Sequence, residues 1–259
     1  MRRHLLIVAL ALAVPLASAN AEAEDLEPLA SFFPLLTRRP VFERLLELHV
    51  EHAKEPAGRQ TTSGLGLELP LLPRWKVGLD GGLVFADPRD RGSQEGLGDT
   101  VIENTVLLFA PRDRRSLVAA GVAVTFPTGS ERRGLGGETG IEPFVTAGLV
   151  RNGWYIVGEI ARHWNLSGPG ADQLQSGVAV GYAVHPLLIP LLELRTTTDL
   201  RGTMETHRPP LRDRTFLALI PGFDVEVRPS VSVGLGVEIP VTRARTTDYT
   251  LRGSVSWSF

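Results

Sequence analysis

Acidic side chains recur at alternate positions along several apolar stretches of the chain, and we expect them to face a shared interior. In a β-strand, successive side chains point to opposite faces, so a carboxylate between two aliphatic residues lies on the face opposite to theirs. The predicted interior residues are Glu68, Lys76, Asp80, Glu103, Glu142, Glu159, Glu193, Arg195, Glu238 and Arg252. If water fills this interior, its negative excess favours cations. In a filled interior, these groups would instead pair with one another.

Residues that support covalent or metal chemistry are sparse. The chain contains no Cys, which excludes thiolate metal sites and thiol nucleophiles. It also has neither a Gly-x-Ser-x-Gly elbow nor a His-Glu-x-x-His helix. His163 and Ser167 come nearest to the Ser–His pair of a lipid hydrolase, but we expect His163 to point inward and Ser167 to lie in a loop. We therefore predict no catalytic residues, no metal and no cofactor, and keep a lipid hydrolase as an alternative.

The elements that would position the interior residues are about twelve strands, each near the roughly 9–11 residues that a tilted membrane strand needs. In the last strand, polar residues alternate with Tyr249, Leu251, Val255, Trp257 and the terminal Phe259. An open apolar edge invites aggregation in water, whereas a closed barrel in lipid pairs such a strand on both sides. We predict an all-β fold, a transmembrane antiparallel β-barrel over residues 44–259. The expected strands are 44–53, 60–69, 74–86, 98–110, 115–126, 138–150, 153–164, 172–184, 188–197, 214–227, 231–241 and 248–259.

The predicted links alternate between short and long. Residues 70–73, 111–114, 151–152, 185–186 and 228–230 form short links, and residues 54–59, 87–97, 127–137, 165–171, 198–213 and 240–247 form longer ones. Bacterial outer-membrane barrels have short periplasmic turns and longer extracellular loops, and an even strand count places both termini in the periplasm. Proline cannot donate to a strand ladder, so Pro143 and Pro190 are expected near strand ends, and a bulge or break is expected at Pro221.

The N-terminus predicts export. Arg2 and Arg3 precede an apolar run over residues 5–16, and small residues follow it, as in a secretory signal peptide over residues 1–21. We therefore expect the protein in the outer membrane of a Gram-negative-type envelope. Residues 22–43 form either an irregular periplasmic lead-in or a small plug folded into the barrel. The formal net charge of −2 argues against nucleic acid as a partner.

Two short motifs carry a family resemblance. Gly96-Leu97-Gly98-Asp99-Thr100 opens one predicted strand, and Val124-Thr125-Phe126-Pro127-Thr128-Gly129 closes the next. This combination resembles the outer-membrane proteins associated with the meta pathway of phenol degradation, which are described as transporter-like. The resemblance implies uptake of a small aromatic or hydrophobic solute and brings no catalytic residues with it. The expected partners are outer-membrane lipids, the solute, and the barrel-assembly machinery through the strand ending at Phe259. A structural or adhesive barrel that binds through its long loops stays as an alternative.

Overall fold

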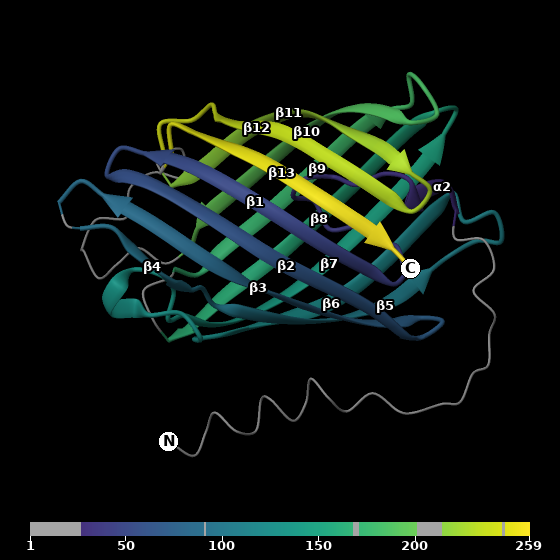
Figure 1. The fold of residues 1–259 in the computed structure, drawn as a ribbon. Coiled ribbons are helices and arrows are strands. Elements are labelled where there is room, and N and C mark those ends of the chain that lie inside the picture. The colour runs from purple at the N-terminus through teal and green to yellow at the C-terminus, as the bar shows by residue number, and fades with distance from the viewer. Residues whose placement is uncertain (1–26, 91, 168–170, 201–213, 245–246) are drawn as a thin grey trace, which may run out of the picture.

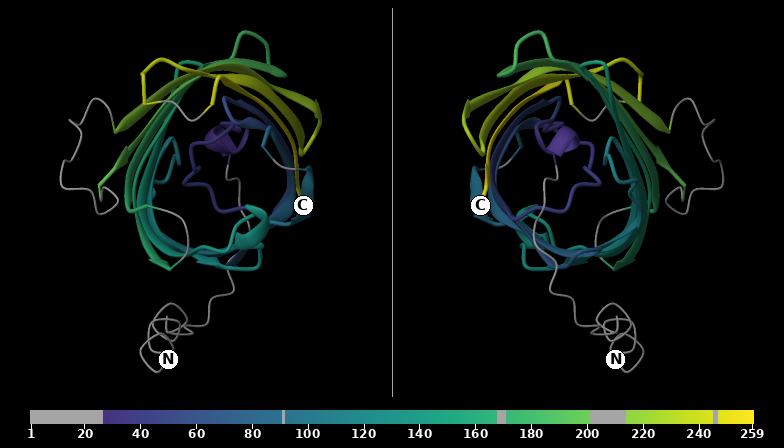
Figure 2. Two further views of the ribbon diagram at one scale, coloured as in Figure 1. Left: turned by 90° about the vertical axis from the view of Figure 1, so that its left-hand side faces the viewer. Right: turned by 90° about the vertical axis from the view of Figure 1, so that its right-hand side faces the viewer.

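The computed structural model describes residues 27–90, 92–167, 171–200, 214–244 and 247–259, so the predicted signal peptide lies outside the described residues. Twelve strands form one closed antiparallel barrel (Figures 1 and 2). They are β1 (Leu45–Glu55), β2 (Gly58–Leu72), β3 (Trp75–Pro88), β5 (Thr100–Phe109), β6 (Ser116–Phe126), β7 (Thr139–Arg151), β8 (Trp154–Ser167), β9 (Gln173–Tyr182), β10 (Leu188–Asp199), β11 (Thr215–Arg228), β12 (Val231–Pro240) and β13 (Tyr249–Ser258). A further short strand, β4 (Gln94–Leu97), pairs only with β3. In the described part of the chain, no helix is long and apolar enough to cross a membrane.

The first and last strands close the barrel. β1 pairs with β13 from Leu45 opposite Ser258 to Lys54 opposite Tyr249, and β13 pairs with β12 on its other side. The backbone N–H of Phe259 donates to the carbonyl of Arg44 at 3.0 Å, which extends this pairing to the last residue. The terminal apolar strand therefore has a partner along each edge, as a barrel requires.

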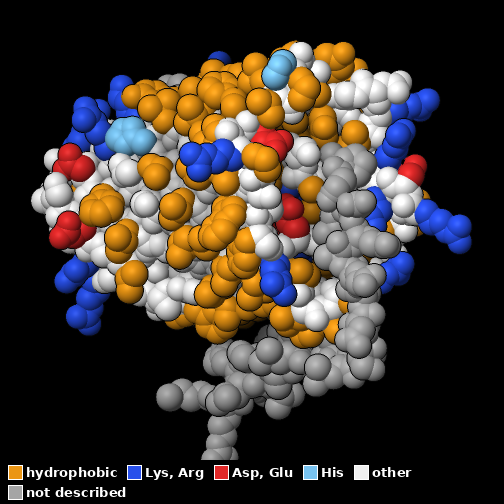
Figure 3. All heavy atoms as spheres, turned by 45° about the vertical axis from the view of Figure 1, so that its right-hand side comes forward, with side chains coloured by type: hydrophobic (Ala, Val, Ile, Leu, Met, Phe, Trp, Pro, Cys, Tyr) orange, Lys and Arg blue, Asp and Glu red, His pale blue; other side chains and the backbone are white. Residues whose placement is uncertain are grey.

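Large apolar side chains are exposed on the outside of the barrel, and Figure 3 shows many of them on one face. Along each strand they alternate with residues that point inward, as the period of two predicts. Exposed outward side chains include Leu48, Leu79, Leu108, Val145, Ile160, Leu192, Leu235 and Val255. An apolar surface that extends around a barrel is the exterior that a hydrocarbon environment favours.

Most expected strands are present, with small differences in their bounds. β1 and β2 run further than predicted and leave only residues 56–57 between them, so the long link expected at residues 54–59 is wrong. The long link over residues 87–97 contains β4. No bulge forms at Pro221, because β11 keeps one register with β12 on either side of it: Leu219 pairs with Ile239, and Gly222 pairs with Gly236. The ladder between β11 and β12 is interrupted between these pairs, at Ile220 and Pro221, which is the expected break.

A stretch before the barrel lies inside it. Residues 29–43, here termed the inner segment, begin in the last turn of the short helix α2 (Glu27–Ala30) and run within the ring of strands (Figure 2). From this segment, Leu29, Phe32, Val41 and Phe42 are buried against the inner wall. Their wall partners are Leu107, Leu117, Ala119, Val157, Ala179, Ile189 and Leu191. An apolar core of the molecule therefore lies between the inner segment and the barrel.

Candidate functional site

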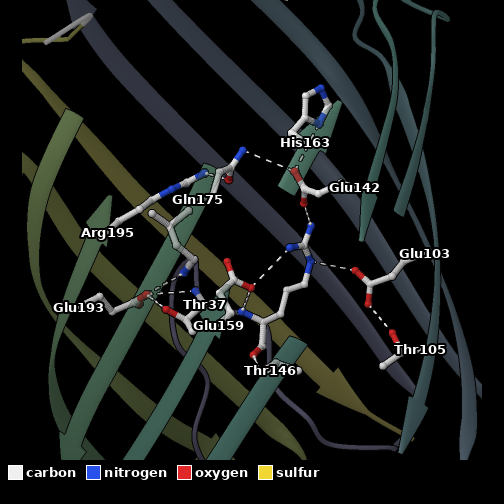
Figure 4. Close-up of polar contacts among 12 residues, drawn as sticks. Thr37, Glu103, Thr105, Glu142, Thr146, Glu159, His163, Gln175, Glu193 and Arg195 are labelled. Atoms are coloured by element: carbon white, nitrogen blue, oxygen red, sulfur yellow. Dashed lines mark hydrogen bonds and ion pairs between the residues drawn. The ribbon is translucent and has the colours of Figure 1, made fainter. Parts of the chain in front are cut away.

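One buried wall carboxylate holds the backbone of the inner segment. Glu193 projects inward from β10 and is only 1% exposed. Its carboxylate accepts hydrogen bonds from the backbone N–H groups of Leu35, Leu36 (3.3 Å) and Thr37 (3.1 Å), and from the Thr37 hydroxyl (2.9 Å) (Figure 4). A buried charge is tolerated only with such donors. The inner segment therefore supplies the hydrogen bonds that this predicted interior residue needs.

A second point of attachment is the side chain of Arg38. Its three nitrogens face three different carboxylates: Nε is 3.0 Å from Glu103, Nη2 is 2.6 Å from Glu142, and Nη1 is 3.5 Å from Glu159. The carboxylates come from β5, β7 and β8 and point toward the same guanidinium group (Figure 4). The guanidinium also lies 4.6 Å from the centre of the Phe144 ring, a favourable position for a cation. We term Glu103, Glu142, Glu159 and Phe144 the cation cage.

Four more of the predicted interior residues form two ion pairs along the wall. Lys76, which is 2% exposed, donates to Glu68 at 2.6 Å. Arg252 donates to Glu238 at 2.7 Å and also pairs with Glu51. These pairs balance charge within the wall, and Nζ of Lys76 also lies 5.6 Å from the centre of the Phe42 ring of the inner segment.

The last two predicted residues lie apart from these pairs. The carboxylate of Asp80 is 3.8 Å from Nδ1 of His49. Arg195 donates to the side chain of Gln175 at 3.1 Å, and Gln175 in turn reaches Glu142 at 3.5 Å. The predicted set is thus divided between the cation cage, the Glu193 attachment and separate wall pairs. Whether all of these residues line a water-filled path stays a prediction.

Glycines on the inner wall leave room for the inner segment. A Cβ atom at Gly148 would lie 2.9 Å from Leu29, and the nearest other atoms belong to Leu29 and Pro40. A Cβ atom at Gly181 would lie 2.6 Å from Phe32. Gly222, Gly234 and Gly236 likewise face the side chain of Leu35. Because a larger residue at these positions would collide with the segment, the wall and the segment fit one another in shape.

Sequence reasoning missed the partners within the inner segment. Arg38 and Thr37 follow an apolar patch and show no strand period, so no pattern pointed to them. The available signal was a basic pair, Arg38 and Arg39, just before a barrel with a predicted acidic interior. The residues of the alternative lipid-hydrolase pair, His163 and Ser167, lie apart. His163 contacts Glu138 and Glu142. The expectation that Ser167 lies in a loop is wrong, because it is the last residue of β8 and pairs with Thr139. It lies four residues beyond His163, about 13 Å along an extended strand.

The two motifs on which the family resemblance rests, residues 96–100 and 124–129, lie together at the end of the barrel that carries the longer loops. The carboxylate of Asp99 accepts backbone hydrogen bonds from Gly129 (2.9 Å), Gly137 (2.8 Å) and Glu138 (2.9 Å). The Thr128 hydroxyl donates to the carbonyl of Gly98 at 2.8 Å. The motifs therefore tie the loop over residues 127–138 to the start of β5.

The fold is shared with outer-membrane channels of known structure. No family model matches the chain, and no curated protein is similar to it in sequence. An outer-membrane channel from Pseudomonas putida F1 matches with a TM-score of 0.67 and 14% identity over 86% of this chain and 97% of that chain. The NanC porin matches with a TM-score of 0.56 and 9% identity, over 82% and 98% of the two chains. The KdgM porin has a TM-score of 0.52 and 8% identity, over 82% and 99%.

These likenesses establish the fold class. The chain forms a closed antiparallel β-barrel of the outer-membrane type, as the alternating strands predicted. The narrower resemblance to the family of the phenol meta pathway is not confirmed by a family model and stays a prediction.

Proposed function

We propose that this protein is an outer-membrane channel for small solutes and that the inner segment closes its pore. The observation that carries the proposal is the way in which the interior is filled. A separate stretch of chain occupies it, attached through Glu193 and Arg38, while wall glycines such as Gly148 leave space for it. A barrel with a purely structural role can instead fill its interior with its own wall side chains. An interior filled by a separate stretch of chain suits a pore that opens when that stretch moves.

The ends of the barrel support an orientation in the membrane. α2 and the C-terminus lie at the same end, at the right in Figure 1, where the shorter turns also gather. We place this end in the periplasm, which is where an exported chain begins and where short barrel turns face. The inner segment then enters from the periplasmic side. Export through the predicted signal peptide over residues 1–21 and assembly through the strand ending at Phe259 belong to the same proposal.

The interior has two zones that suggest the character of the solute. One zone is apolar and includes Leu107, Leu117 and Leu191, which the inner segment now covers. The other is acidic and contains the cation cage and Glu193. Once the segment moves away, a solute would meet both zones. This arrangement favours a small molecule with an apolar body over an inorganic anion, in keeping with the family resemblance.

Current recordings in planar bilayers test the channel. The substitution Gly148→Leu places a side chain where Leu29 and Pro40 now lie. Overpacking of this kind costs about 1–3 kcal/mol, so the fraction of time in the open state should rise about tenfold over the wild-type protein. Discrete, cation-selective steps are expected.

The matched control is Gly158→Leu on the outer face of β8, where a Cβ atom would meet only ordinary contacts at 3.6 Å and beyond. It should behave like the wild-type protein. If the wild-type and both variant barrels pass no current, the channel proposal fails and the structural or adhesive alternative gains support. Silence together with lipid hydrolysis would favour the hydrolase.

A further inference from the structure

The cation cage contains more negative charge than is needed to attach one side chain. Each nitrogen of the Arg38 guanidinium has its own carboxylate, from Glu103, Glu142 or Glu159. A single carboxylate is sufficient to hold an arginine in place. Even if His163, which lies 3.3 Å from Glu142, is protonated, negative charge exceeds positive charge among these groups. The arrangement resembles a receptor for a guanidinium more than a simple tether.

The wall contacts two of the three cage carboxylates independently of Arg38, whereas Glu159 accepts hydrogen bonds from the backbone N–H (3.2 Å) and the side chain (3.5 Å) of Arg38. Glu103 accepts a hydrogen bond from the Thr105 hydroxyl at 2.8 Å, and Glu142 accepts one from Gln175 at 3.5 Å. Phe144, which forms the aromatic face, is only 4% exposed and is fixed by its packing. A site whose groups are already oriented by neighbours loses little entropy when a ligand binds. Glu103, Glu142 and Phe144 should therefore keep their positions when the inner segment leaves.

The cation in the cage comes from the inner segment and not from the barrel wall. If the segment closes a pore, then Arg38 occupies a site that faces the solute path whenever the pore is open. Three carboxylates around a planar cation, with an aromatic ring against one face, match a guanidinium group. A hydrated metal ion would make less use of the ring and of the separated carboxylates.

We propose that the cage formed by Glu103, Glu142, Glu159 and Phe144 is a binding site for a small guanidinium-bearing solute, and that Arg38 occupies it in the closed barrel. The inference rests on the proposed channel function and names the chemical class of its solute. Arg38 then acts as a built-in competitor, so solute binding and docking of the inner segment exclude one another.

Titration calorimetry of the folded, detergent-solubilised full chain tests the cage, with guanidinium chloride as the probe at millimolar concentration and fixed ionic strength. The variant Arg38→Ala empties the cage and should bind guanidinium at least about tenfold more tightly than the wild-type protein. Arg39→Ala is the matched control, because Arg39 pairs with Glu43 inside the same segment; it should bind as weakly as the wild-type protein. Adding Glu159→Gln to Arg38→Ala should weaken binding about tenfold.

A second variant keeps the test valid if Arg38→Ala does not fold. Gly148→Leu displaces the segment without altering the cage and should also gain guanidinium binding. Tetramethylammonium, which has the same charge but no N–H groups, should bind Arg38→Ala at least about tenfold more weakly. Equal binding of both cations, or no gain in either variant, would overturn the proposal.

The outcomes separate the two proposals. If Arg38→Ala binds guanidinium but the barrel never conducts, the proposed guanidinium site is supported and the proposed channel function fails. If Gly148→Leu carries a cation-selective current but binds no guanidinium, the proposed guanidinium site fails and the proposed channel function is supported.

Discussion

At the scale of single residues, the sequence predicts which way a side chain points but not what it meets. Glu193 lies between Leu192 and Leu194, and this alternation correctly places it on the inner face. Its donors on Leu35, Leu36 and Thr37 are separated from it by 156 to 158 positions along the chain. No local pattern links two stretches so far apart, because their contact is set by barrel closure and complementary shape.

Glu193 also yields a prediction about how firmly the inner segment is attached. Glu193→Gln removes the negative charge from an acceptor of backbone N–H groups. Hydrogen bonds to a charged group contribute about 1.5–3 kcal/mol, so docking of the segment should weaken by about 2 kcal/mol. Hydrogen exchange at the amides of residues 35–37 should accelerate accordingly. Glu131→Gln, on the exposed outer loop, serves as the control. Unchanged exchange in Glu193→Gln would show that this carboxylate does not hold the segment.

At the scale of elements, strands with clear alternation are predicted well and irregular stretches are not. β6 (Ser116–Phe126) begins within one residue of the expected strand, because aliphatic and small residues alternate throughout it. Pro143 illustrates how a barrel accommodates proline. β7 keeps one register with β8 on either side of it, with Ile141 opposite Trp164 and Phe144 opposite Ala161. The missing N–H costs local pairing without forcing a bulge.

The inner segment marks the limit of pattern reading. It has no period of two or of 3.6 residues, so the sequence left two alternatives, a lead-in at the mouth and a plug. Its path inside the barrel follows from wall features such as Gly181, which leaves space for Phe32. Those features are recognisable only when the strands are arranged in a ring.

The loop over residues 127–138 yields a prediction at this scale. Asp99 is its principal polar anchor, accepting hydrogen bonds from the backbone N–H groups of Gly129, Gly137 and Glu138. Asp99→Ala leaves these donors without their acceptor, which should loosen the loop by about 2 kcal/mol. Hydrogen exchange at these amides should rise, while exchange in β10 stays unchanged. Asp113→Ala, in a short turn at the other end, provides the control. If exchange in the loop does not change in Asp99→Ala, the two motifs have another role.

At the scale of the whole molecule, the alternation of apolar and polar residues along the strands accounts for both the outer and the inner surface of the barrel. Residues such as Leu192 make the exterior apolar, and their neighbours, such as Glu193, make the interior acidic. The sequence therefore predicts the closed barrel and the charge of its interior. It does not predict that the interior is occupied, because occupancy depends on a segment that lies outside the alternating pattern. The proposed channel depends on whether this segment can leave.

A reversible disulfide between the inner segment and the barrel wall tests most directly whether the channel opens only when the segment leaves. The chain contains no Cys, so the double substitution Thr37→Cys with Gly177→Cys introduces a single pair of thiols. A Cβ atom at Gly177 would lie 3.1 Å from Oγ1 of Thr37, which is suitable for a disulfide between the inner segment and β9. Planar-bilayer currents are then recorded from the same protein before and after reduction.

We expect the oxidised protein to be silent and the reduced protein to open at least as often as the wild-type chain, because Thr37→Cys also removes a hydrogen bond to Glu193. Each single-cysteine variant should be insensitive to oxidation. Equal currents from the oxidised and reduced forms, with the disulfide verified by mass spectrometry, would contradict the account, since ions would then pass while the inner segment stays in place.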